Sequence, residues 1–544
     1  VWVVRQKQND SADYFLGGRD ATWLAIGASI FASNIGSEHL IGLAGAGASS
    51  GMAMAHWEIQ GWMILILGWV FVPFYTRSMV YTMPEFLERR YNPQSRTILS
   101  VISLVSYVLT KVAVTVYAGG LVFQQVFGIK ELWGIDFFWI AAIGLVVLTA
   151  LYTIFGGMKS VLYTSVLQTP ILLLGSLIIL VLGFKELGGW DEMMRVCGAV
   201  TVNDYGDTMT NLIRSNDDAN FPWLGALIGS AIIGFWYWCT DQFIVQRVLS
   251  GKNEMEARRG TIFGAYLKLL PVFLFLIPGM IAFALHQKYI GAGGEGFLPM
   301  LANGTANADA AFPTLVAKLL PAGVKGLVVC GILAALMSSL ASLFNSSAML
   351  FTIDFYKRFK PETPEKKLVG IGQIATIVIV VLGILWIPIM RSVGDVLYTY
   401  LQDVQSVLAP GIAAAFLLGI CWKRTSAQGG MWGLISGMVI GLTRLGAKVY
   451  YSNAGEVADS TFKYLFYDMN WLFFCGWMFL FCIIVVIVVS LATEAPTAEK
   501  IQGLVFGTAT KKQKAATRAS WNHWDIIHTV IILAITAAFY WYFW

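Results

Sequence analysis

Charged residues are scarce in this chain of 544 residues: Asp, Glu, Lys and Arg make up 13% of it, whereas 57% is hydrophobic. A soluble domain carries roughly a quarter charged residues, so the composition excludes an ordinary soluble protein and indicates an integral membrane protein. The net charge of +5 is explained by basic loops on one side of a membrane and requires no nucleic-acid partner.

Motifs of several other functional classes are also missing. The six cysteines include no CxxC pair and no disulfide framework, and the lack of cysteine pairs in the outer loops favours a bacterial inner membrane. No Walker loop is present, so ATP is not expected to drive the protein directly. No nucleophile–base pair or metal-ligand set is visible, so the sequence does not predict an enzyme.

Apolar runs of about 20 residues, long enough to cross a bilayer, recur along the whole chain and predict an all-α membrane fold. Residues 1–21 are interpreted as the end of a truncated span followed by a cytoplasmic loop. The complete spans are expected at about 22–46, 52–82, 97–126, 136–156, 160–184, 223–248, 260–286, 322–354, 367–390, 395–420, 428–448, 469–493 and 525–543.

Lysine and arginine are concentrated in alternate loops. They follow the second and eighth spans, for example at Arg89–Arg90 and Lys357–Arg358, and they also precede the last span. The positive-inside rule therefore places these loops in the cytoplasm and the C-terminus outside. Two longer loops on the outer side, 185–221 and 288–321, are expected to act as lids.

The first complete span contains an unusually polar stretch, Phe31-Ala32-Ser33-Asn34-Ile35-Gly36-Ser37-Glu38-His39. A carboxylate and an imidazole at that depth normally line a cavity or an ion path, while Ser, Asn and Gly favour a local break in the helix. Backbone carbonyls freed by a break need a partner inside a membrane. The stretch therefore predicts a broken transporter helix that offers carbonyls to a cation and side chains to a polar solute.

Further polar and aromatic side chains lie inside other spans and are candidates for contact with the solute. They mix hydrogen-bond donors and acceptors with flat apolar faces, a combination that suits a neutral polyhydroxylated ring. An acidic sugar would need an unpaired arginine, and none is evident. The candidates are Asn34, His39, Glu58, Tyr237, Trp238, Lys268 and Gln402.

The eighth span offers a second set of oxygen ligands. Ser338 and Ser339 supply hydroxyls, and the Ala335 carbonyl lies on the same face of the helix. With the carbonyls of Ala32 and Ile35 they would form a shell of neutral oxygens. Na⁺ is a hard cation that prefers oxygen ligands, so the sequence predicts a weak, releasable Na⁺ site.

Long collinear motifs resemble those of the sodium/glucose cotransporters, which include galactose and inositol transporters, within the sodium/solute symporter family. The resemblance covers about residues 13–442. It is carried by Ser33-Asn34-Ile35-Gly36-Ser37-x-His39, Gly42-Leu43-Ala44-Gly45, Trp236-Tyr237-Trp238-Cys239-x-Asp241-Gln242, Tyr266-Leu267-Lys268-Leu269 and Leu333-Ala334-Ala335-Leu336-Met337-Ser338-Ser339.

This resemblance implies a LeuT-like fold with two inverted repeats of five spans, at 22–184 and 223–420. An extracellular loop at 185–222 would join the repeats, and peripheral spans with a cytoplasmic linker would follow at 421–544. The first and sixth spans would be the broken ones. The implied function is symport of a neutral, glucose- or galactose-like sugar with Na⁺ by alternating access across the cell membrane.

The resemblance also implies gates on both sides of the solute. Leu43, Trp57 and Tyr398 would form the outer apolar gate, and Tyr237 would be the aromatic gate on the cytoplasmic side, with Trp238 beside it. Asn34, His39, Glu58, Lys268 and Gln402 would bind sugar hydroxyls.

Several positions depart from the family pattern. Ser165 stands where relatives often carry Asp, and Ala341 where two-sodium members carry Thr, so one Na⁺ per solute is expected. Gly234 replaces Asn or Ser, and Gln60 lies in a pair that differs from relatives, which leaves the solute in doubt. Glu38 replaces a small residue of the mammalian members.

Each assignment has a simpler structural alternative. The two serines could serve close helix packing, Lys268 could extend its amine to the membrane surface or form a structural ion pair with Glu58, and His39, Tyr237 and Trp238 could be core residues. Functional alternatives are a symporter of myo-inositol or sialic acid, and a membrane sensor that binds solute without moving it. The sequence leaves open the solute and whether the protein is a monomer or a homodimer.

Overall fold

The computed structural model describes residues 10–36, 38–301, 304–391, 397–453 and 458–544. Most of the predicted N-terminal stub, residues 1–9, therefore lies outside the described residues. The side chains of a few further residues are also not described: 108–110, 113, 121, 125, 386–391, 397–401, 403, 452 and 453.

The first part of the protein is helical except for one short hairpin. Its elements are α1 (Ser11–Leu16), η1 (Gly17–Arg19), α2 (Trp23–Asn34), η2 (Glu38–Leu43), α3 (Ala44–Ser50), η3 (Gly51–Met54), α4 (Ala55–Glu58), α5 (Gly61–Ile66), η4 (Leu67–Phe71), α6 (Val72–Ser78), α7 (Met83–Arg90), α8 (Pro93–Ser106), η5 (Tyr107–Val112), α9 (Ala113–Phe127), β1 (Glu131–Leu132), β2 (Ile135–Asp136), α10 (Phe137–Leu187) and α11 (Trp190–Gly198).

The second part contains the remaining helices. They are α12 (Trp223–Gly234), η6 (Phe235–Thr240), α13 (Gln242–Leu249), α14 (Glu254–Lys268), η7 (Val272–Leu276), α15 (Ile277–Gly291), η8 (Ala308–Ala310), α16 (Ala311–Leu319), α17 (Ala322–Met349), η9 (Leu350–Tyr356), α18 (Lys357–Phe359), α19 (Glu365–Arg391), α20 (Leu397–Cys421), α21 (Ala427–Asn453), α22 (Thr461–Lys463), η10 (Tyr464–Asp468), α23 (Trp471–Ala492), α24 (Ala498–Ile501), α25 (Lys511–Ala519) and α26 (His523–Tyr542).

Among the described residues, the predicted spans correspond to mainly helical stretches that are interrupted at a few positions. Nine helical stretches there are long and apolar enough to cross a membrane; other predicted spans are divided into shorter helices. The two spans expected at 136–156 and 160–184 form the single element α10, which turns at Gly157 with φ 53° and ψ −151°. A side chain at this position would run into the Tyr14 carbonyl, which explains the glycine.

Both of the expected helix breaks are present. Helix α2 ends at Asn34, and Ile35 is extended with ψ 107°, after which the π-helical turn η2 resumes at Glu38. In the sixth span, η6 ends at Thr240 and Asp241 is extended with ψ 127° before α13 begins. The prediction of interrupted first and sixth spans is thus confirmed.

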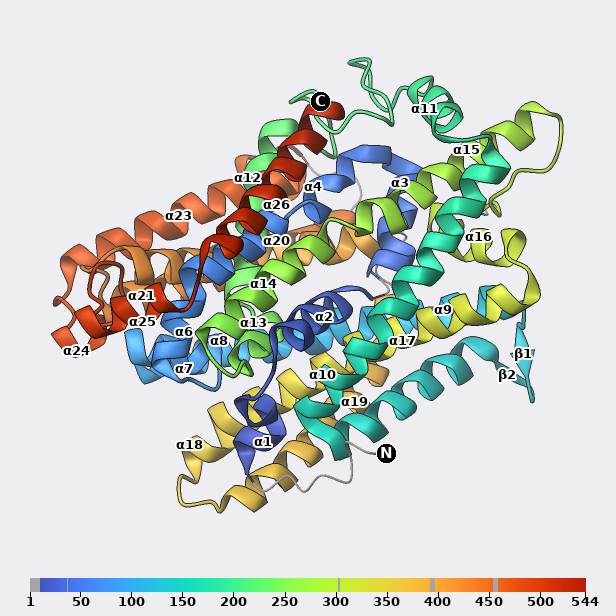
Figure 1. Cartoon of the computed structure of the whole chain (residues 1–544). Coiled ribbons are helices and arrows are strands. Elements are labelled where there is room, and N and C mark those ends of the chain that lie inside the picture. The colour runs from blue at the N-terminus through green and yellow to red at the C-terminus, as the bar shows by residue number, and fades with distance from the viewer. Residues whose placement is uncertain (1–9, 37, 302–303, 392–396, 454–457) are drawn as a thin grey trace.

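The short hairpin and the long loops lie at one end of the helix bundle. Strands β1 and β2 pair antiparallel through Trp133 and Gly134, which both have positive φ, as a tight two-residue hairpin requires. Figure 1 shows α11 and α16 at the upper right, in the loops predicted to be lids, on the same side as the C-terminus. The basic elements α7, α18 and α25 lie toward the lower left.

The cysteines agree with the sequence prediction. All six are free, and Cys197, Cys239, Cys475 and Cys482 are buried. No disulfide bond links these cysteines, so the stability of the fold depends on helix packing and on buried polar contacts.

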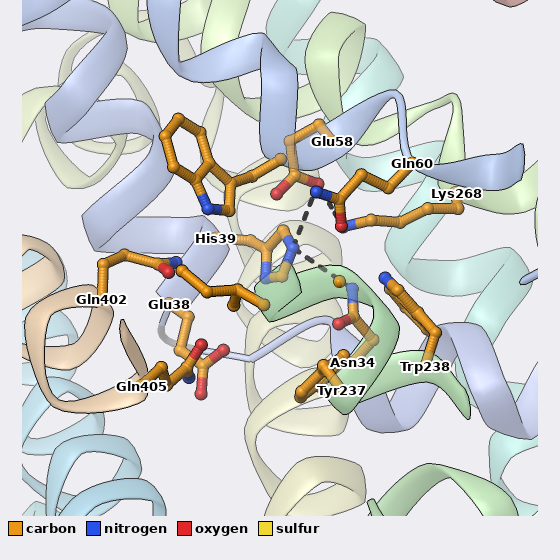
Figure 2. Close-up of a pocket in the computed structure, with 13 residues that line it drawn as sticks. Asn34, Glu38, His39, Glu58, Gln60, Tyr237, Trp238, Lys268, Gln402 and Gln405 are labelled. Carbon is orange, nitrogen blue, oxygen red and sulfur yellow. Dashed lines mark hydrogen bonds and ion pairs between the residues drawn. The ribbon is translucent and has the colours of Figure 1, made fainter. Parts of the chain in front are cut away.

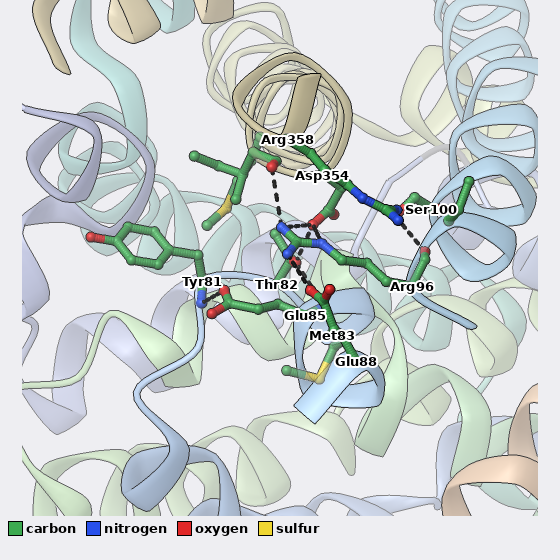
Figure 3. Close-up of polar contacts among 12 residues, drawn as sticks. Tyr81, Thr82, Met83, Glu85, Glu88, Arg96, Ser100, Asp354 and Arg358 are labelled. Atoms are coloured by element: carbon green, nitrogen blue, oxygen red, sulfur yellow. Dashed lines mark hydrogen bonds and ion pairs between the residues drawn. The ribbon is translucent and has the colours of Figure 1, made fainter. Parts of the chain in front are cut away.

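A buried polar cluster ties together elements at the basic end (Figure 3). The Arg96 guanidinium on α8 lies 2.6 Å from Asp354 of η9 and 2.6 Å from Glu88 of α7. The Thr82 hydroxyl donates to the same Asp354 oxygen at 2.9 Å and also caps α7 by accepting from the Glu85 amide. One carboxylate thus joins the end of the second span to the third and the eighth.

Replacing Arg96 with Met should leave Asp354, whose side chain is fully buried, without its cation. We expect a loss of about 3 kcal/mol in the free energy of unfolding, since removing one partner of a buried ion pair strands the other charge. Thermal unfolding of the purified protein measures the effect.

Arg89→Met is the matched control, because Arg89 is 45% exposed and pairs with Glu85 at the surface. Adding Asp354→Leu to Arg96→Met should restore much of the stability. Equal effects of the two single arginine replacements would contradict the prediction.

Candidate functional site

A pocket lies between the two broken spans and the helices packed against them (Figure 2). It is narrow, with a cavity volume of about 40 Å³. Its lining includes every residue predicted to contact the solute. The lining residues are Asn34, Glu38, His39, Trp57, Glu58, Gln60, Ile233, Gly234, Tyr237, Trp238, Lys268, Gln402 and Gln405.

Glu58 is the centre of the polar contacts in this pocket. Its Oε2 lies 2.6 Å from Lys268 Nζ and 3.2 Å from His39 Nε2. All three side chains are buried, so the Lys268 ammonium compensates the carboxylate charge in place of water. The Lys268 amine also lies 5.4 Å from the centre of the Trp238 ring. Lys268 therefore does not reach the membrane surface, and the structural ion pair considered from the sequence exists and lines the pocket.

His39 has one ring nitrogen engaged and one free. Its Nε2 lies 3.3 Å from the Asn34 amide nitrogen as well as near Glu58, but one nitrogen cannot donate and accept at once. If Nε2 donates to the carboxylate, Nδ1 carries a lone pair, and no described residue lies within hydrogen-bond distance of Nδ1. A solute hydroxyl in the pocket could donate to it.

Two other buried polar atoms of the pocket lining also have no partner in the described part of the chain. They are Trp57 Nε1, which can only donate, and Gln402 Oε1, which can only accept. Buried polar groups are normally hydrogen-bonded, and exceptions require an explanation. The pocket thus offers a free donor and a free acceptor besides His39 Nδ1, and a molecule with hydroxyl groups can satisfy all of them.

The side chain of Gln60 fills the space beside Gly234. A β-carbon at Gly234 would collide with the side-chain amide of Gln60, which is held by a 2.8 Å hydrogen bond from its Nε2 to the Ser230 carbonyl. The glutamine therefore occupies the space that a larger residue at 234 would need. The two positions are therefore structurally coupled, which neither position indicates by itself in the sequence.

The aromatic floor of the pocket rests on Lys111, which the sequence analysis did not single out. Its Nζ lies 4.5 Å from the ring centres of Tyr237 and Phe243 and 2.7 Å from Asp241 Oδ2. Asp241 also accepts from the Tyr107 hydroxyl and caps α13. The ammonium thereby ties the third span to the break in the sixth, directly under the predicted gate Tyr237.

Arg247 is buried near the gate but forms no ion pair with Asp241 among the described residues. Its guanidinium donates to the Phe243 carbonyl and lies 5.1 Å from the ring of that residue. Asp241 is engaged by a backbone group as well as by Lys111, since the Phe243 amide donates to it.

The predicted outer gate is only partly described. Trp57 lines the pocket and stacks on Trp471 with ring centres 5.5 Å apart, and it meets Phe221 edge-on at 6.1 Å. Leu43 is fully buried in η2 but does not line the pocket. The side chain of Tyr398 lies outside the described residues.

A candidate cation site lies where the end of α2 meets α17. The last carbonyls of a helix have no partner within it and carry partial negative charge, and Ala32 is one of these in α2. Gly36 packs so closely on α17 that a β-carbon would stand 3.1 Å from Ser339 Oγ. Ser338 Oγ lies 3.2 Å from Ser165 Oγ of α10. The structure thus gathers hydroxyls from two spans beside the broken end of the first.

Comparison with known proteins identifies the family. The model of the sodium:solute symporter family matches residues 14–437. The chain belongs to this family. The human sodium/myo-inositol cotransporter 2 is 36% identical over 522 residues, covering 93% of this chain and 76% of that protein. The dog sodium/myo-inositol cotransporter is 37% identical over 525 residues, covering 92% and 72%.

Solved structures place this symporter family member in the LeuT-like fold. A Na⁺-coupled sialic acid symporter in a substrate-bound, outward-open state superimposes with a TM-score of 0.71 at 22% identity, covering 91% of this chain and 95% of that one. MhsT in complex with L-phenylalanine gives 0.50 at 12% identity, covering 87% and 99%. The predicted fold class is confirmed.

Sequence reasoning missed some residues of the pocket. Gln405 is one of several polar residues in the tenth span, and nothing in the sequence distinguishes it from the others. Ile233 is an ordinary apolar residue. Lys111 is a lysine inside the third span, and an ionisable residue in a membrane helix is itself a signal of a functional position. That signal was available and could have identified it.

We predict that Gly234→Asn raises the KM for solute about tenfold, equivalent to roughly 1.4 kcal/mol, because the new side chain displaces Gln60 into an already narrow pocket. Na⁺-driven uptake into proteoliposomes measures it. The double variant Gly234→Asn, Gln60→Gly should recover part of the loss, and independent, additive effects would contradict the coupling.

Proposed function

We propose that this symporter imports a neutral polyhydroxylated ring, a hexose or a cyclic polyol such as myo-inositol, together with Na⁺. The observation that carries the proposal is the set of unpartnered atoms in the pocket: Trp57 Nε1, Gln402 Oε1 and His39 Nδ1. A hydroxyl group both donates and accepts, so vicinal hydroxyls can pair with all three. The aromatic faces of Tyr237 and Trp238 suit the apolar C–H face of such a ring.

The charge balance disfavours an acidic sugar. Lys268 is the cation in the pocket lining, and Glu58 already neutralises it at 2.6 Å. Glu38, a second acidic residue in the lining, supplies no cation. An anionic solute such as a sialic acid would therefore enter without a free cation to receive it. The relatives named as sodium/myo-inositol cotransporters also support a polyol.

The coupling ion is proposed to bind between the carbonyls of Ala32, Ile35 and Ala335 and the hydroxyls of Ser338 and Ser339. Neutral oxygens hold a hard monovalent cation weakly enough for release. Such a cation would satisfy carbonyls that the break in α2 leaves without helix partners. We propose one Na⁺ per solute, because Ser165 and Ala341 provide no additional carboxylate or hydroxyl pair for a second ion.

Transport would proceed by alternating access between the two proposed repeats, 22–184 and 223–420. Na⁺ would stabilise the broken first span and thereby order Asn34 and His39 for the solute. Such coupling is reciprocal and typically amounts to about 1–3 kcal/mol. A sensor that binds solute without moving it finds less support, because the family is one of symporters.

In proteoliposomes, an inward Na⁺ gradient should drive accumulation of labelled myo-inositol or a neutral hexose, and choline or K⁺ should not replace Na⁺. Sialic acid serves as the acidic comparison. Gln402→Leu should raise the KM for the neutral solute about tenfold, since one acceptor is lost. Uptake without Na⁺, or a preference for the acidic sugar, would contradict the proposal.

Ser339→Ala should raise the Na⁺ concentration for half-maximal uptake about tenfold, equivalent to roughly 1.4 kcal/mol, while solute affinity at saturating Na⁺ changes little. Ser347→Ala is the matched control, because Ser347 is another buried serine of α17, and its hydroxyl finds no partner among the described residues. If both variants behave alike, Ser339 is not a Na⁺ ligand.

A further inference from the structure

A second pocket opens at the basic end of the bundle, away from the solute site. It lies where α7, the start of α21, the end of α23 and the segment before α24 meet, and its volume is about 590 Å³. Three charged residues line it: Arg90, Lys500 and Glu494. Nothing in the transport function proposed above uses this pocket.

Arg90 is a buried cation without a counter-ion. The residue is 1% exposed, and its guanidinium donates to the carbonyls of Gly419 at 2.6 Å and Trp422 at 3.3 Å. Among the described residues, its Nη1 has no hydrogen-bond partner, and no carboxylate lies within ion-pair distance. Removing a charge from water without a partner of opposite sign costs several kcal/mol, so the site favours an anion.

The N-terminus of α21 adds further donors to the same pocket. The first amides of a helix have no acceptor within it, and here the Ser426 hydroxyl and carbonyl accept from Gly429 and Gly430. The amides of Ala427 and Gln428, which both line the pocket, find no acceptor in the part of the chain that the structure describes. Free amides at a helix N-terminus are a common phosphate-binding device.

The rim of the pocket combines the Lys500 ammonium with an apolar surface. Lys500 is half-buried and donates to the Glu88 carbonyl at 2.8 Å, which leaves its other ammonium protons for a ligand. On α23, just before the pocket, Val488 and Leu491 are 57% and 62% exposed. Side chains of this kind on a membrane helix face acyl chains.

We propose that this pocket binds a phosphate group, held by the Arg90 guanidinium, the Lys500 ammonium and the amides of Ala427 and Gln428. The shared chemistry is a phosphate mono- or diester anion, which could belong to an anionic phospholipid or to a soluble phosphate. The apolar face of α23 beside the pocket favours the lipid. Basic pockets between membrane helices at the cytoplasmic surface are suited to anionic head groups.

The test uses the full chain and measures its melting temperature. In one arm the protein is placed in vesicles of phosphatidylcholine alone or with added phosphatidylglycerol. In the other arm, protein in detergent is titrated with inorganic phosphate against chloride at equal ionic strength. We expect phosphatidylglycerol to raise the melting temperature by a few degrees, and bound lipid to be detected by native mass spectrometry.

Three variants make the test specific. Lys500→Gln should weaken the apparent affinity for the anion about tenfold, and Arg90→Gln should abolish the response. Glu494→Gln removes the one carboxylate of the lining and should strengthen binding, an effect in the opposite direction that a loss of folding cannot produce. Lys512→Gln, an exposed basic residue of α25, is the control and should leave the response unchanged.

The outcomes separate the two sources. A response to phosphatidylglycerol that Lys500→Gln reduces and Glu494→Gln enlarges supports a lipid head group. A response to inorganic phosphate alone, with the same dependence on the variants, supports a soluble phosphate and overturns the lipid. If the wild type responds to neither, or all variants respond like Lys512→Gln, the site does not exist.

Discussion

Backbone carbonyls that leave a helix inside a membrane must find another partner, and this constraint connects the proposed ion site to the pocket. Helix α2 ends at Asn34 in the middle of its span, and the chain turns at Ile35 before η2 begins. The same break brings Gly36 against Ser339 of α17 and places Asn34 and His39 in the pocket lining. An ion bound at the proposed site would therefore act on neighbouring residues of the pocket, and no long-range path would be needed to couple ion and solute.

Two buried lysine–carboxylate pairs lie around the pocket, and each pair joins separate spans. Lys268 of α14 neutralises Glu58 of α4, and Lys111 of η5 neutralises Asp241 at the break of the sixth span. Each pair is costly to separate once it is away from water. The pairs therefore fix the spans that form the wall and the floor of the pocket relative to one another. Because the Lys268 ammonium in the lining is already neutralised, the pocket has no free positive charge for an anion, which is the electrostatic reason to expect a neutral solute.

The second break repeats this principle with different groups. At Asp241 the side chain, rather than a bound ion, satisfies the start of the next helix by capping α13. The aromatic rings beside it enclose the ammonium of Lys111. The helix that follows the break in the sixth span thus has its first amide satisfied by a protein side chain. This difference supports the proposal that the first span is the one that responds to the ion.

The sequence by itself determined the membrane class, the spans, the break at Asn34 and most of the pocket lining, because an ionisable or helix-breaking residue inside an apolar run is costly and therefore informative. It could not show that Gln60 fills the space beside Gly234, or that Arg90 is buried without a counter-ion. Those facts depend on which helices pack against each other over long separations in the chain, and only the tertiary structure decides which polar atoms find a partner and which remain free for a ligand.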